Sequence, residues 1–252
     1  MKNPFSLENK TILITGASSG IGQQTAVLCS QMGAKVVLIG RNEERLQKTL
    51  SMMEGEGHLK VTFDLTETDN IKELISKIVS EVGKTDGLVC AAGIEKSAPF
   101  KLLTPSDYED ILKVNTISAF ELVRHATGIK HINTPASIVF ISSITSVIAR
   151  PTTAAYSASK GALIGGARVM AAELAKRNIR VNCISPGTIL TPLMQNYLSS
   201  LSEEDYMKRI GGFPLGLGQT SDIANACVFL LSDASRWMTG QNMIIDGGYT
   251  AI

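Results

Sequence analysis

Three side chains in the middle of this 252-residue chain suit a proton-transfer site. Tyr156 and Lys160 are four residues apart in a segment with a helical pattern, so they share one face of the expected helix. A tyrosine with a pKa of about 10 is a poor acid–base at neutral pH, and a nearby ammonium would lower that pKa by stabilising the phenolate. Ser143 follows a predicted strand and could donate a hydrogen bond to a carbonyl oxygen that becomes an alkoxide. The alternative is a surface tyrosine–lysine pair and a serine at a strand end.

Asn115 lies four residues after Ile111, on the apolar stripe of a predicted helix. This position predicts a buried amide, which is costly without hydrogen-bond partners. The pattern leaves two roles equally open for Asn115, a structural hydrogen bond or the holding of a water molecule for proton transfer.

A glycine-rich turn, TGASSGIG at 15–22, lies between the first predicted strand and the first predicted helix. Glycines there let the backbone approach a pyrophosphate, and the helix N-terminus offers free N–H groups and the positive end of its dipole. The spacing GxxxGxG is a variant of the general dinucleotide-binding pattern. The residues expected to contact a dinucleotide here are Gly16, Ser18, Ser19, Gly20, Ile21 and Gly22. A tight turn without a ligand is the alternative.

Arg41 follows the second predicted strand, 19 residues after Gly22. Dinucleotide-binding folds place an acid near this position for NAD, or an arginine for the 2′-phosphate of NADP. Because no acid ends this strand, Arg41 is predicted to bind that phosphate, which favours NADP(H) over NAD(H). Arg41 could instead be a surface arginine beside a helix start, because Asn42 followed by Glu43 and Glu44 is a good N-terminal signal.

Short β-branched, apolar runs alternate with helical patterns along the whole chain, as in parallel sheets that are covered on both faces. The predicted strands are 11–15, 35–39, 61–65, 88–91, 137–141, 180–184 and 243–246. Apolar residues at helical spacing predict a helix over 71–82. The alternation predicts an α/β, doubly wound parallel sheet. Ligands bind such sheets at the carboxyl ends of the strands, so we expect one crevice lined by Gly16, Arg41, Asp64, Gly93, Ser143 and Pro186.

The composition excludes several classes of function. With 24 basic and 23 acidic residues, the chain has no global field for nucleic acid or an anionic membrane. It has no run of 18 apolar residues, and the segment MKNPFSLENK lacks the apolar stretch of a signal peptide. Four scattered cysteines are expected to be reduced and buried, which predicts a cytoplasmic protein without a metal cluster. No repeat or linker interrupts residues 1–252, so a single catalytic domain is expected.

Together these motifs resemble the single-domain branch of the short-chain dehydrogenase/reductase family. The resemblance rests on TGASSGIG, Asn115, Ser143 and the segment from Tyr156 to Lys160, and continues through Asp64-Leu65, Ala92-Gly93, Pro186-Gly187 with Thr191, and TGQNMIIDGG at 239–248. It implies a Rossmann-type, three-layer α/β/α fold with a seven-stranded parallel sheet. It also implies a homotetramer or homodimer that pairs through the two helices after strands four and five.

The resemblance implies a role for each matching residue. Tyr156 would be the general acid–base, Lys160 would tune its pKa and bind the nicotinamide ribose, and Ser143 would anchor the substrate carbonyl. Asn115 would support a water molecule in the proton relay. Asp64 would lie against the adenine, and Thr191 would meet the nicotinamide carboxamide. The remaining cofactor contacts would be Leu65, Ala92, Gly93, Pro186, Gly187 and Ile189.

One segment departs from the family pattern. The family usually has AsnAsnAlaGly after the fourth strand, whereas this chain has Cys90-Ala91-Ala92-Gly93. The lost asparagines remove hydrogen bonds at the sheet centre, but Ala92-Gly93 keeps the small surface that a cofactor needs. We therefore expect a change in stability rather than in binding, with Cys90 as core.

These features predict an NADP(H)-dependent oxidoreductase that transfers a hydride between the nicotinamide and a carbonyl or secondary alcohol, without a metal. A nucleotide-sugar epimerase is disfavoured because only 65 residues follow Gly187. The other alternative is a non-catalytic nucleotide sensor or scaffold of the same fold, although such proteins typically lose the Tyr, Lys or Ser.

The substrate is a small carbonyl compound or alcohol whose class is left open. The C-terminal third is similar to 3-oxoacyl-(acyl-carrier-protein) reductases, which implies a 3-oxoacyl thioester and contacts of an acidic carrier with Lys130, Lys176 and Arg177. These bases also suit helix ends without a partner. A sugar or polyol dehydrogenase is the alternative. The irregular segment 188–215 is predicted to be a mobile substrate lid, or else two short helices with inward apolar faces.

Overall fold

The computed structural model describes residues 3–251, apart from the side chains of Leu193 and Arg209, and is built on one sheet of seven parallel strands. The strand order is β3-β2-β1-β4-β5-β6-β7, which confirms the predicted doubly wound, Rossmann-type sheet. The strands are β1 (Thr11–Thr15), β2 (Lys35–Gly40), β3 (Leu59–Thr62), β4 (Thr85–Cys90), β5 (Ile132–Ile141), β6 (Ile179–Pro186) and β7 (Asn242–Ile245).

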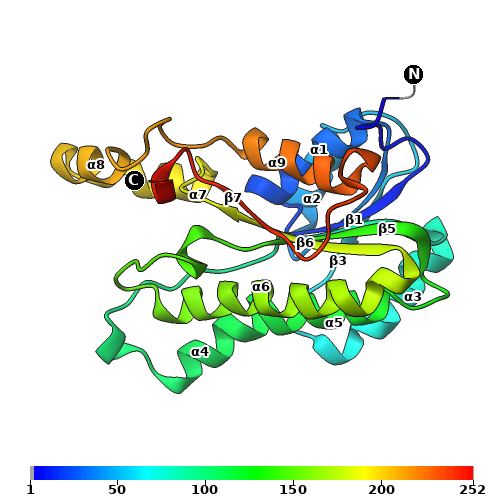
Figure 1. The fold of residues 1–252 in the computed structure, drawn as a ribbon, viewed down its shortest axis with the longest axis horizontal. Helices are drawn as coiled ribbons and strands as arrows, with labels where there is room; N and C mark the ends of the chain where they lie inside the picture. The colour runs from blue at the N-terminus through cyan, green and yellow to red at the C-terminus, as the bar shows by residue number, and fades with distance from the viewer. Residues whose placement is uncertain (1–2, 252) are drawn as a thin grey trace.

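Helices cover both faces of the sheet (Figure 1). One face carries α1 (Gly20–Gln31), α2 (Glu43–Leu50) and α9 (Thr220–Leu231). The other carries α3 (Ile71–Val82), α4 (Pro105–Leu112), α5 (Ser118–Ala126) and α6 (Ala154–Leu174). Among the described residues, no helix combines the length and apolar character that crossing a membrane requires.

Each face of the sheet has its own apolar core because successive strand residues point to opposite sides. In β5, Ile138 and Phe140 join the core under α3, α5 and α6, whereas Val139 joins the core under α1 and α9. Phe140 is fully buried and meets Phe120 of α5 edge to face at 5.9 Å between ring centroids. Burial of such a side chain stabilises the fold by about 1.5–3 kcal/mol.

The glycines of α6 divide between the two sides of the helix. A side chain at Gly166 would overlap the ring of Phe120, so this glycine allows α6 to approach α5 closely. Gly161 and Gly165 have no neighbouring atom within 4 Å of where a side chain would begin. The small residues of α6 therefore serve inward packing at one position and leave an open surface at two others.

The predicted helix over 71–82 is confirmed as α3, the predicted strand over 11–15 is confirmed as β1, and the other predicted strands are found with shifted ends. β5 begins at Ile132 instead of at 137, and β3 is displaced as a whole, from 61–65 to Leu59–Thr62. The chain leaves the strand where the Asp64 carboxylate accepts hydrogen bonds from the amide and hydroxyl of Thr66, at 2.9 and 2.8 Å. Such a local turn competes with the strand ladder.

The segment predicted as a lid contains two short helices, α7 (Pro192–Ser199) and α8 (Glu203–Ile210). Both begin at side-chain caps, in which the hydroxyls of Thr191 and Ser202 accept backbone N–H groups. Figure 1 shows α8 projecting beyond the rest of this half of the molecule. Leu198 and Phe213 are buried beneath the segment, whereas Met207 is exposed.

Candidate active site

Ser143, Tyr156 and Lys160 come together where β5 ends and α6 begins. Lys160 is buried, and its ammonium donates a hydrogen bond of 2.8 Å to the carbonyl oxygen of Ile141, the last residue of β5. The same ammonium lies 5.7 Å from the ring centroid of Tyr156. The helical spacing therefore does place the phenol and the ammonium on one side of α6.

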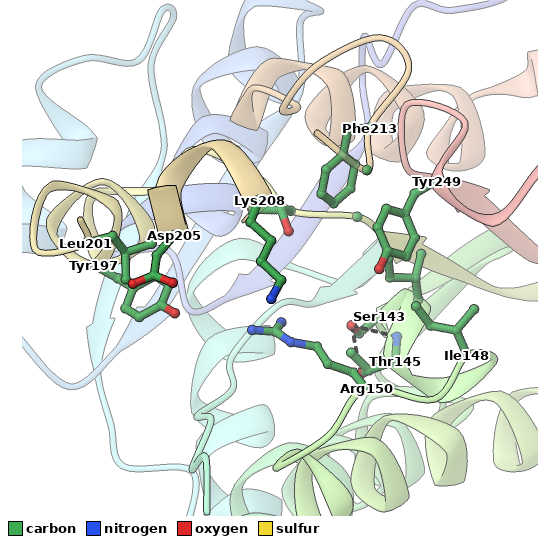
Figure 2. Close-up of a pocket in the computed structure, with 14 residues that line it drawn as sticks. Ser143, Thr145, Ile148, Arg150, Tyr197, Leu201, Asp205, Lys208, Phe213 and Tyr249 are labelled. Atoms are coloured by element: carbon green, nitrogen blue, oxygen red, sulfur yellow. Dashed lines mark hydrogen bonds between the residues drawn. The ribbon is translucent and has the colours of Figure 1, made fainter. Parts of the chain in front are cut away.

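The hydroxyl of Ser143 is oriented by its neighbour Thr145. The amide and hydroxyl of Thr145 donate to Ser143 Oγ at 3.2 and 3.0 Å (Figure 2). A hydroxyl has one donor and two acceptor positions, so these bonds leave the Ser143 proton free to be donated. The Ser143 hydroxyl also forms a hydrogen bond with Tyr156, and this bond lowers the pKa of the phenol. Ser143 and Tyr156 can thus act on one oxygen atom.

Burial controls the acidity of both titratable groups. It raises the pKa of Tyr156 to about 12, aided by the charge of Glu95 and opposed by Ser143 and Arg150. Burial lowers the pKa of Lys160 to about 8. The sequence-based expectation that Lys160 lowers the pKa of Tyr156 below its ordinary value is therefore corrected, because desolvation of the phenolate outweighs every favourable charge.

Asn115 is buried in a π-helical turn, Lys113–Ile117, between α4 and α5. Its amide nitrogen donates to the carbonyl oxygen of Ile94 and to the hydroxyl of Ser159, both at 2.9 Å, and its oxygen accepts the amide of Ile94 at 2.8 Å. The side chain ties the loop after β4 to α6. Of the two roles that the sequence left open, these contacts account for the structural one.

The turn between β1 and α1 has the shape of a phosphate cradle. Gly16 adopts φ +65°, and a Cβ there would lie 2.9 Å from the Cα of Ala92. A Cβ at Gly22 would overlap the carbonyl oxygen of Gly16. Ser19 precedes the first turn of α1 without a capping hydrogen bond from its side chain. This uncapped helix N-terminus above a surface that only glycine permits fits the pyrophosphate of a dinucleotide.

In the segment that departs from AsnAsnAlaGly, the backbone after β4 is held by Thr15. Its hydroxyl accepts the amides of Ala91 and Ala92, at 3.1 and 3.2 Å. Cys90 is buried in the core, as predicted, and all four cysteines are buried and free. Gly93 lies beside both Lys160 and Asn115, since a Cβ there would be 3.2 Å from Lys160 Nζ and from Asn115 Oδ1.

Arg41 and Asp64 are neighbours at the ends of β2 and β3. Their closest side-chain atoms, Arg41 Nη1 and Asp64 Oδ2, are 3.9 Å apart, and the Arg41 side chain is 69% exposed. The hydrogen bonds from Thr66 and the charge of Arg41 lower the pKa of Asp64. Asn42 caps α2 by accepting the amide of Arg45, as the second interpretation of this segment expected. The guanidinium of Arg41 therefore stays largely exposed at the end of β2.

The segment after β6 returns to the phosphate turn. Thr191 packs against Gly20, with its methyl group 3.2 Å from where a Cβ of that glycine would be. Gly187 donates its amide to Ile245 at 2.9 Å, and Ile189 is buried. The sequence-predicted positions on β1, β4, β5 and β6 thus meet at one edge of the sheet.

A cavity of about 580 Å3 opens beside Ser143, between the end of β5 and the segment from α7 to Phe213. Sequence analysis missed several of its polar residues, including Thr145, Arg150, Asp205, Lys208 and Tyr249. Arg150 lies in the sequence between Ser143 and Tyr156. This position was the one signal in the sequence that could have indicated its place in the cavity. The ring of Tyr249 packs on Phe213 at 4.6 Å between centroids.

The basic residues expected at the entrance lie elsewhere. Lys130 precedes β5, and Lys176 and Arg177 precede β6, so all three are at the amino ends of the strands. The cavity is at the carboxyl ends. Arg177 instead donates to the carbonyl oxygen of Thr127 at 2.8 Å. Within one chain, these bases cannot contact a carrier at the entrance, and that expectation is corrected.

Comparison with known proteins identifies the family. Residues 16–250 match the family model described as enoyl-(acyl carrier protein) reductase. The chain is 37% identical over 245 residues to a 3-oxoacyl-(acyl-carrier-protein) reductase of Thermotoga maritima, covering 96% of this chain and 98% of the relative. It is 35% identical over 251 residues to a glucose 1-dehydrogenase of Gluconobacter oxydans, covering 96% and 92%.

Among solved structures, the fold is similar to that of a proposed NAD(P)-dependent gluconate 5-dehydrogenase from Beutenbergia cavernae with bound NADP at low occupancy. The TM-score is 0.89 and the identity 30%, over 99% of this chain and all of the other.

Proposed function

This chain belongs to the short-chain dehydrogenase/reductase family, and from that premise we propose that it is an NADP(H)-dependent oxidoreductase that interconverts a carbonyl group and a secondary alcohol. The observation that carries the proposal is the hydroxyl of Ser143. Thr145 donates twice to its oxygen, so the Ser143 proton remains for Tyr156 or for a substrate oxygen, and Ser143 lines the cavity.

The residues divide the work on one substrate oxygen. Ser143 and Tyr156 donate hydrogen bonds that polarise the carbonyl, and Tyr156 gives its proton to the oxygen as the alcohol forms. In the reverse direction, the phenolate of Tyr156 takes the proton from the alcohol. The ammonium of Lys160, 5.7 Å from the Tyr156 ring centroid, would favour the phenolate against the cost of its burial and would bind the ribose next to the nicotinamide. When bound, the nicotinamide supplies or accepts the hydride.

The cradle formed by Gly16, Gly20 and Gly22 would hold the pyrophosphate, and Asp64 and Leu65 would border the adenine. Arg41 supports the choice of NADP(H) over NAD(H) because its guanidinium is exposed at the end of β2 and has no closer acid than Asp64 at 3.9 Å among the described ion pairs. Thr191 would meet the carboxamide from the start of α7.

Two substrate classes follow from the relatives. A 3-oxoacyl thioester, presented by an acyl carrier protein, is suggested by the Thermotoga maritima relative. A sugar or polyol is suggested by the glucose and gluconate dehydrogenases. A cavity of about 580 Å3 is within the size range of small-molecule sites, so it admits either class.

The same proposal extends to assembly and location. We propose a homodimer or homotetramer that pairs through α5 and α6, where Gly161 and Gly165 leave room for a second helix. The whole chain would act as one catalytic domain, with 188–215 as a mobile lid. The four free, buried cysteines suit the reducing cytoplasm.

Consumption of the dinucleotide tests the proposal. Purified protein is mixed with NADPH and a panel of ketones and 3-oxoacyl thioesters, and the loss of reduced nicotinamide absorbance is followed. We expect turnover with at least one class. Tight binding of NADPH without consumption, in either direction and with every substrate class, would instead favour a non-catalytic nucleotide sensor.

A further inference from the structure

Two cations face one another in the cavity beside Ser143. Arg150 lies in the loop between β5 and α6, and Lys208 lies on α8, about sixty residues later in the chain. Figure 2 shows the guanidinium and the ammonium pointing toward each other across the cavity. Like charges that line one cavity repel each other, and an anion bound between them would remove the repulsion.

No acid forms an ion pair with Arg150 or Lys208 in the described part of the chain, and the one acid among the lining residues leaves a net charge of +1. Asp205 also lines the cavity, but its carboxylate accepts the hydroxyl of Ser202 at 2.8 Å and serves the first turn of α8. Glu95 acts on Tyr156 and Lys160 from the loop after β4 and does not line the cavity.

Arg150 is held in place by its own loop. The hydroxyl of Thr153 donates to the carbonyl oxygen of Arg150 at 2.8 Å. Thr152 adopts φ +71°, an uncommon conformation for a β-branched residue, and its carbonyl oxygen accepts the amide of Ala98 at 2.9 Å. These bonds fix the loop close enough for the Arg150 guanidinium to lower the pKa of Tyr156. One cation therefore comes from the loop that also acts on Tyr156, and the other comes from the proposed lid.

We propose that Arg150 and Lys208 together bind an oxyanion of the substrate, either a carboxylate or a phosphate, so that the preferred substrate is an acid. This inference rests on the proposed function, because it identifies the substrate class of the same site. The names of the relatives include both a neutral sugar and a sugar acid, so family membership does not decide between them. Binding of the anion would also draw α8 toward the loop at Arg150 and close the cavity.

Matched pairs of alcohols test the proposal, with NADP+ as oxidant. The pairs are D-gluconate and sorbitol, 3-hydroxybutyrate and its methyl ester, and glycerol 3-phosphate and glycerol. A charge-assisted contact predicts a preference of about 10- to 100-fold in kcat/KM for the acid. A preference confined to the phosphate pair would identify the anion as a phosphate, and one confined to the other pairs as a carboxylate.

Variants then separate charge recognition from catalysis. Lys208→Met should raise KM for the acid by about tenfold or more without shifting the pH profile of kcat, because Lys208 is not among the charges that act on Tyr156. Arg150→Met should raise KM and also shift the pH profile, and Arg150→Lys should recover part of the affinity. Lys77→Met, at an exposed position of α3, is the matched control.

A binding measurement gives a readout apart from turnover. D-gluconate should raise the melting temperature of NADP+-saturated wild-type protein more than sorbitol does, and Lys208→Met should remove the difference. The inference would be overturned if kcat/KM were the same for both members of every pair, or if Lys208→Met lowered kcat/KM equally for both. Either result would leave the proposed oxidoreductase activity unaffected. Failure of the proposed function would show separately, as no melting shift with any nicotinamide dinucleotide.

Discussion

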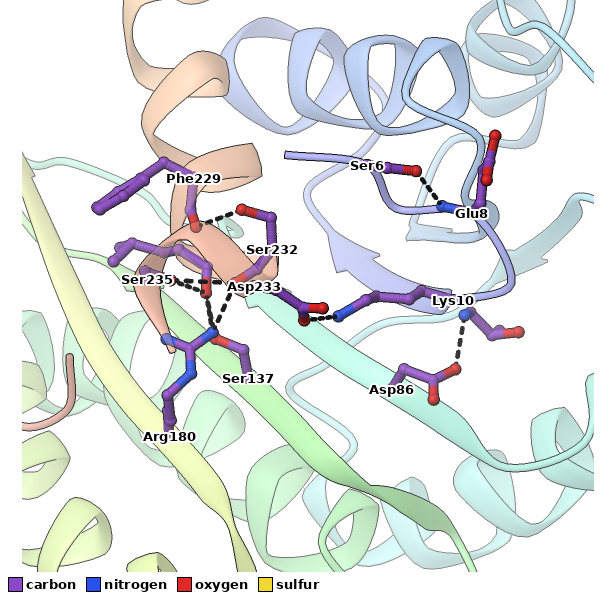
Figure 3. Close-up of polar contacts among 12 residues, drawn as sticks. Ser6, Glu8, Lys10, Asp86, Ser137, Arg180, Phe229, Ser232, Asp233 and Ser235 are labelled. Atoms are coloured by element: carbon purple, nitrogen blue, oxygen red, sulfur yellow. Dashed lines mark hydrogen bonds and ion pairs between the residues drawn. The ribbon is translucent and has the colours of Figure 1, made fainter. Parts of the chain in front are cut away.

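The two edges of the same sheet use their polar groups in opposite ways. At the amino ends of the strands, Lys10 and Arg180 are paired within the protein (Figure 3). At the carboxyl ends, α1 begins without a side-chain cap, and Arg150 and Lys208 face one another across a cavity. Polar groups that the protein does not satisfy itself can be satisfied by a ligand, so this contrast separates the edge that stabilises the fold from the edge that does chemistry.

We call the amino ends of the strands the closed edge of the sheet and the carboxyl ends the open edge. Lys10 and Arg180 illustrate the closed edge. Lys10 pairs with Asp233 at 3.0 Å. The guanidinium of Arg180 donates to backbone carbonyl oxygens at 2.6, 3.2 and 3.2 Å, in Leu230, Ser232 and Met238. These bonds join β6 to the end of α9, although burial lowers the pKa of Arg180. Each carbonyl so held is unavailable to a ligand.

The largest effect is expected from Tyr156→Phe at the open edge. Loss of the general acid–base should reduce turnover by about 10²- to 10⁴-fold. The melting temperature and the affinity for NADPH should change little, because the hydroxyl that is removed contacts Ser143, which faces the substrate rather than the dinucleotide. Normal turnover in this variant would remove Tyr156 from the mechanism.

Arg180→Met should do the reverse at the closed edge. Leaving buried carbonyl groups without a donor costs about 1–3 kcal/mol, which corresponds to a fall in melting temperature of roughly 2–12 °C. The KM for the dinucleotide and substrate should stay unchanged in the folded fraction. Arg236→Met, at an exposed position nearby, serves as the control. A large rise in KM with unchanged stability would show that the two edges are not separate.

Lys160→Met should raise stability and remove activity. Holding the ammonium buried lowers its pKa from 10.5 to about 8, which corresponds to roughly 3 kcal/mol of destabilisation. The unpaired Ile141 carbonyl would offset about 1–2 kcal/mol of the gain, so a net stabilisation of about 1–2 kcal/mol is expected at pH 7.

The pH dependence of that gain follows from the direction of the shift. Below pH 8, Lys160 is charged in both the folded and the unfolded protein, and the cost is complete. Between pH 8 and 10.5, the folded protein has lost the proton and the unfolded chain keeps it, so the cost fades. Urea unfolding of both proteins at pH 7 and above pH 10 measures this. A gain that is constant with pH would contradict the buried-ammonium explanation.

The smallest of these effects is expected from Arg41→Asp. Loss of a phosphate contact and the added negative charge should weaken NADPH binding by about tenfold or more, with little effect on NADH. Titration of intrinsic fluorescence with each dinucleotide compares the two. Equal losses would make Arg41 a surface residue beside the cap of α2.

Sequence reasoning predicted the open edge in outline because phosphate turns and strand ends have local patterns. The bounds of α3 follow from its apolar spacing, and Asn115 was identified as buried from its place on a stripe. The end of β3 was misplaced because the Asp64–Thr66 turn competes with the strand through side-chain hydrogen bonds that periodicity does not record.

The missed residues have a common physical reason. Arg150 and Lys208 look like ordinary surface charges in the sequence, and only the three-dimensional fold brings the loop before α6 and helix α8 to one cavity. The acidity of Tyr156 was predicted in the wrong direction because a sequence shows the neighbouring charge of Lys160 but not the loss of water around the phenol. The spacing of two residues in the sequence predicts whether they are neighbours on one helix. It does not predict how deeply a side chain is buried between helices, strands and loops.

The most direct test of the central claim, that the open edge binds a nicotinamide dinucleotide, is a thermal-shift titration with NADPH and NADH. At about 100 times the dissociation constant, binding should add roughly 2.7 kcal/mol of stability, or about 5–10 °C. We predict a shift of this size with NADPH, a smaller one with NADH, and the same NADPH shift in Arg180→Met. No shift with either dinucleotide, reduced or oxidised, would contradict the account.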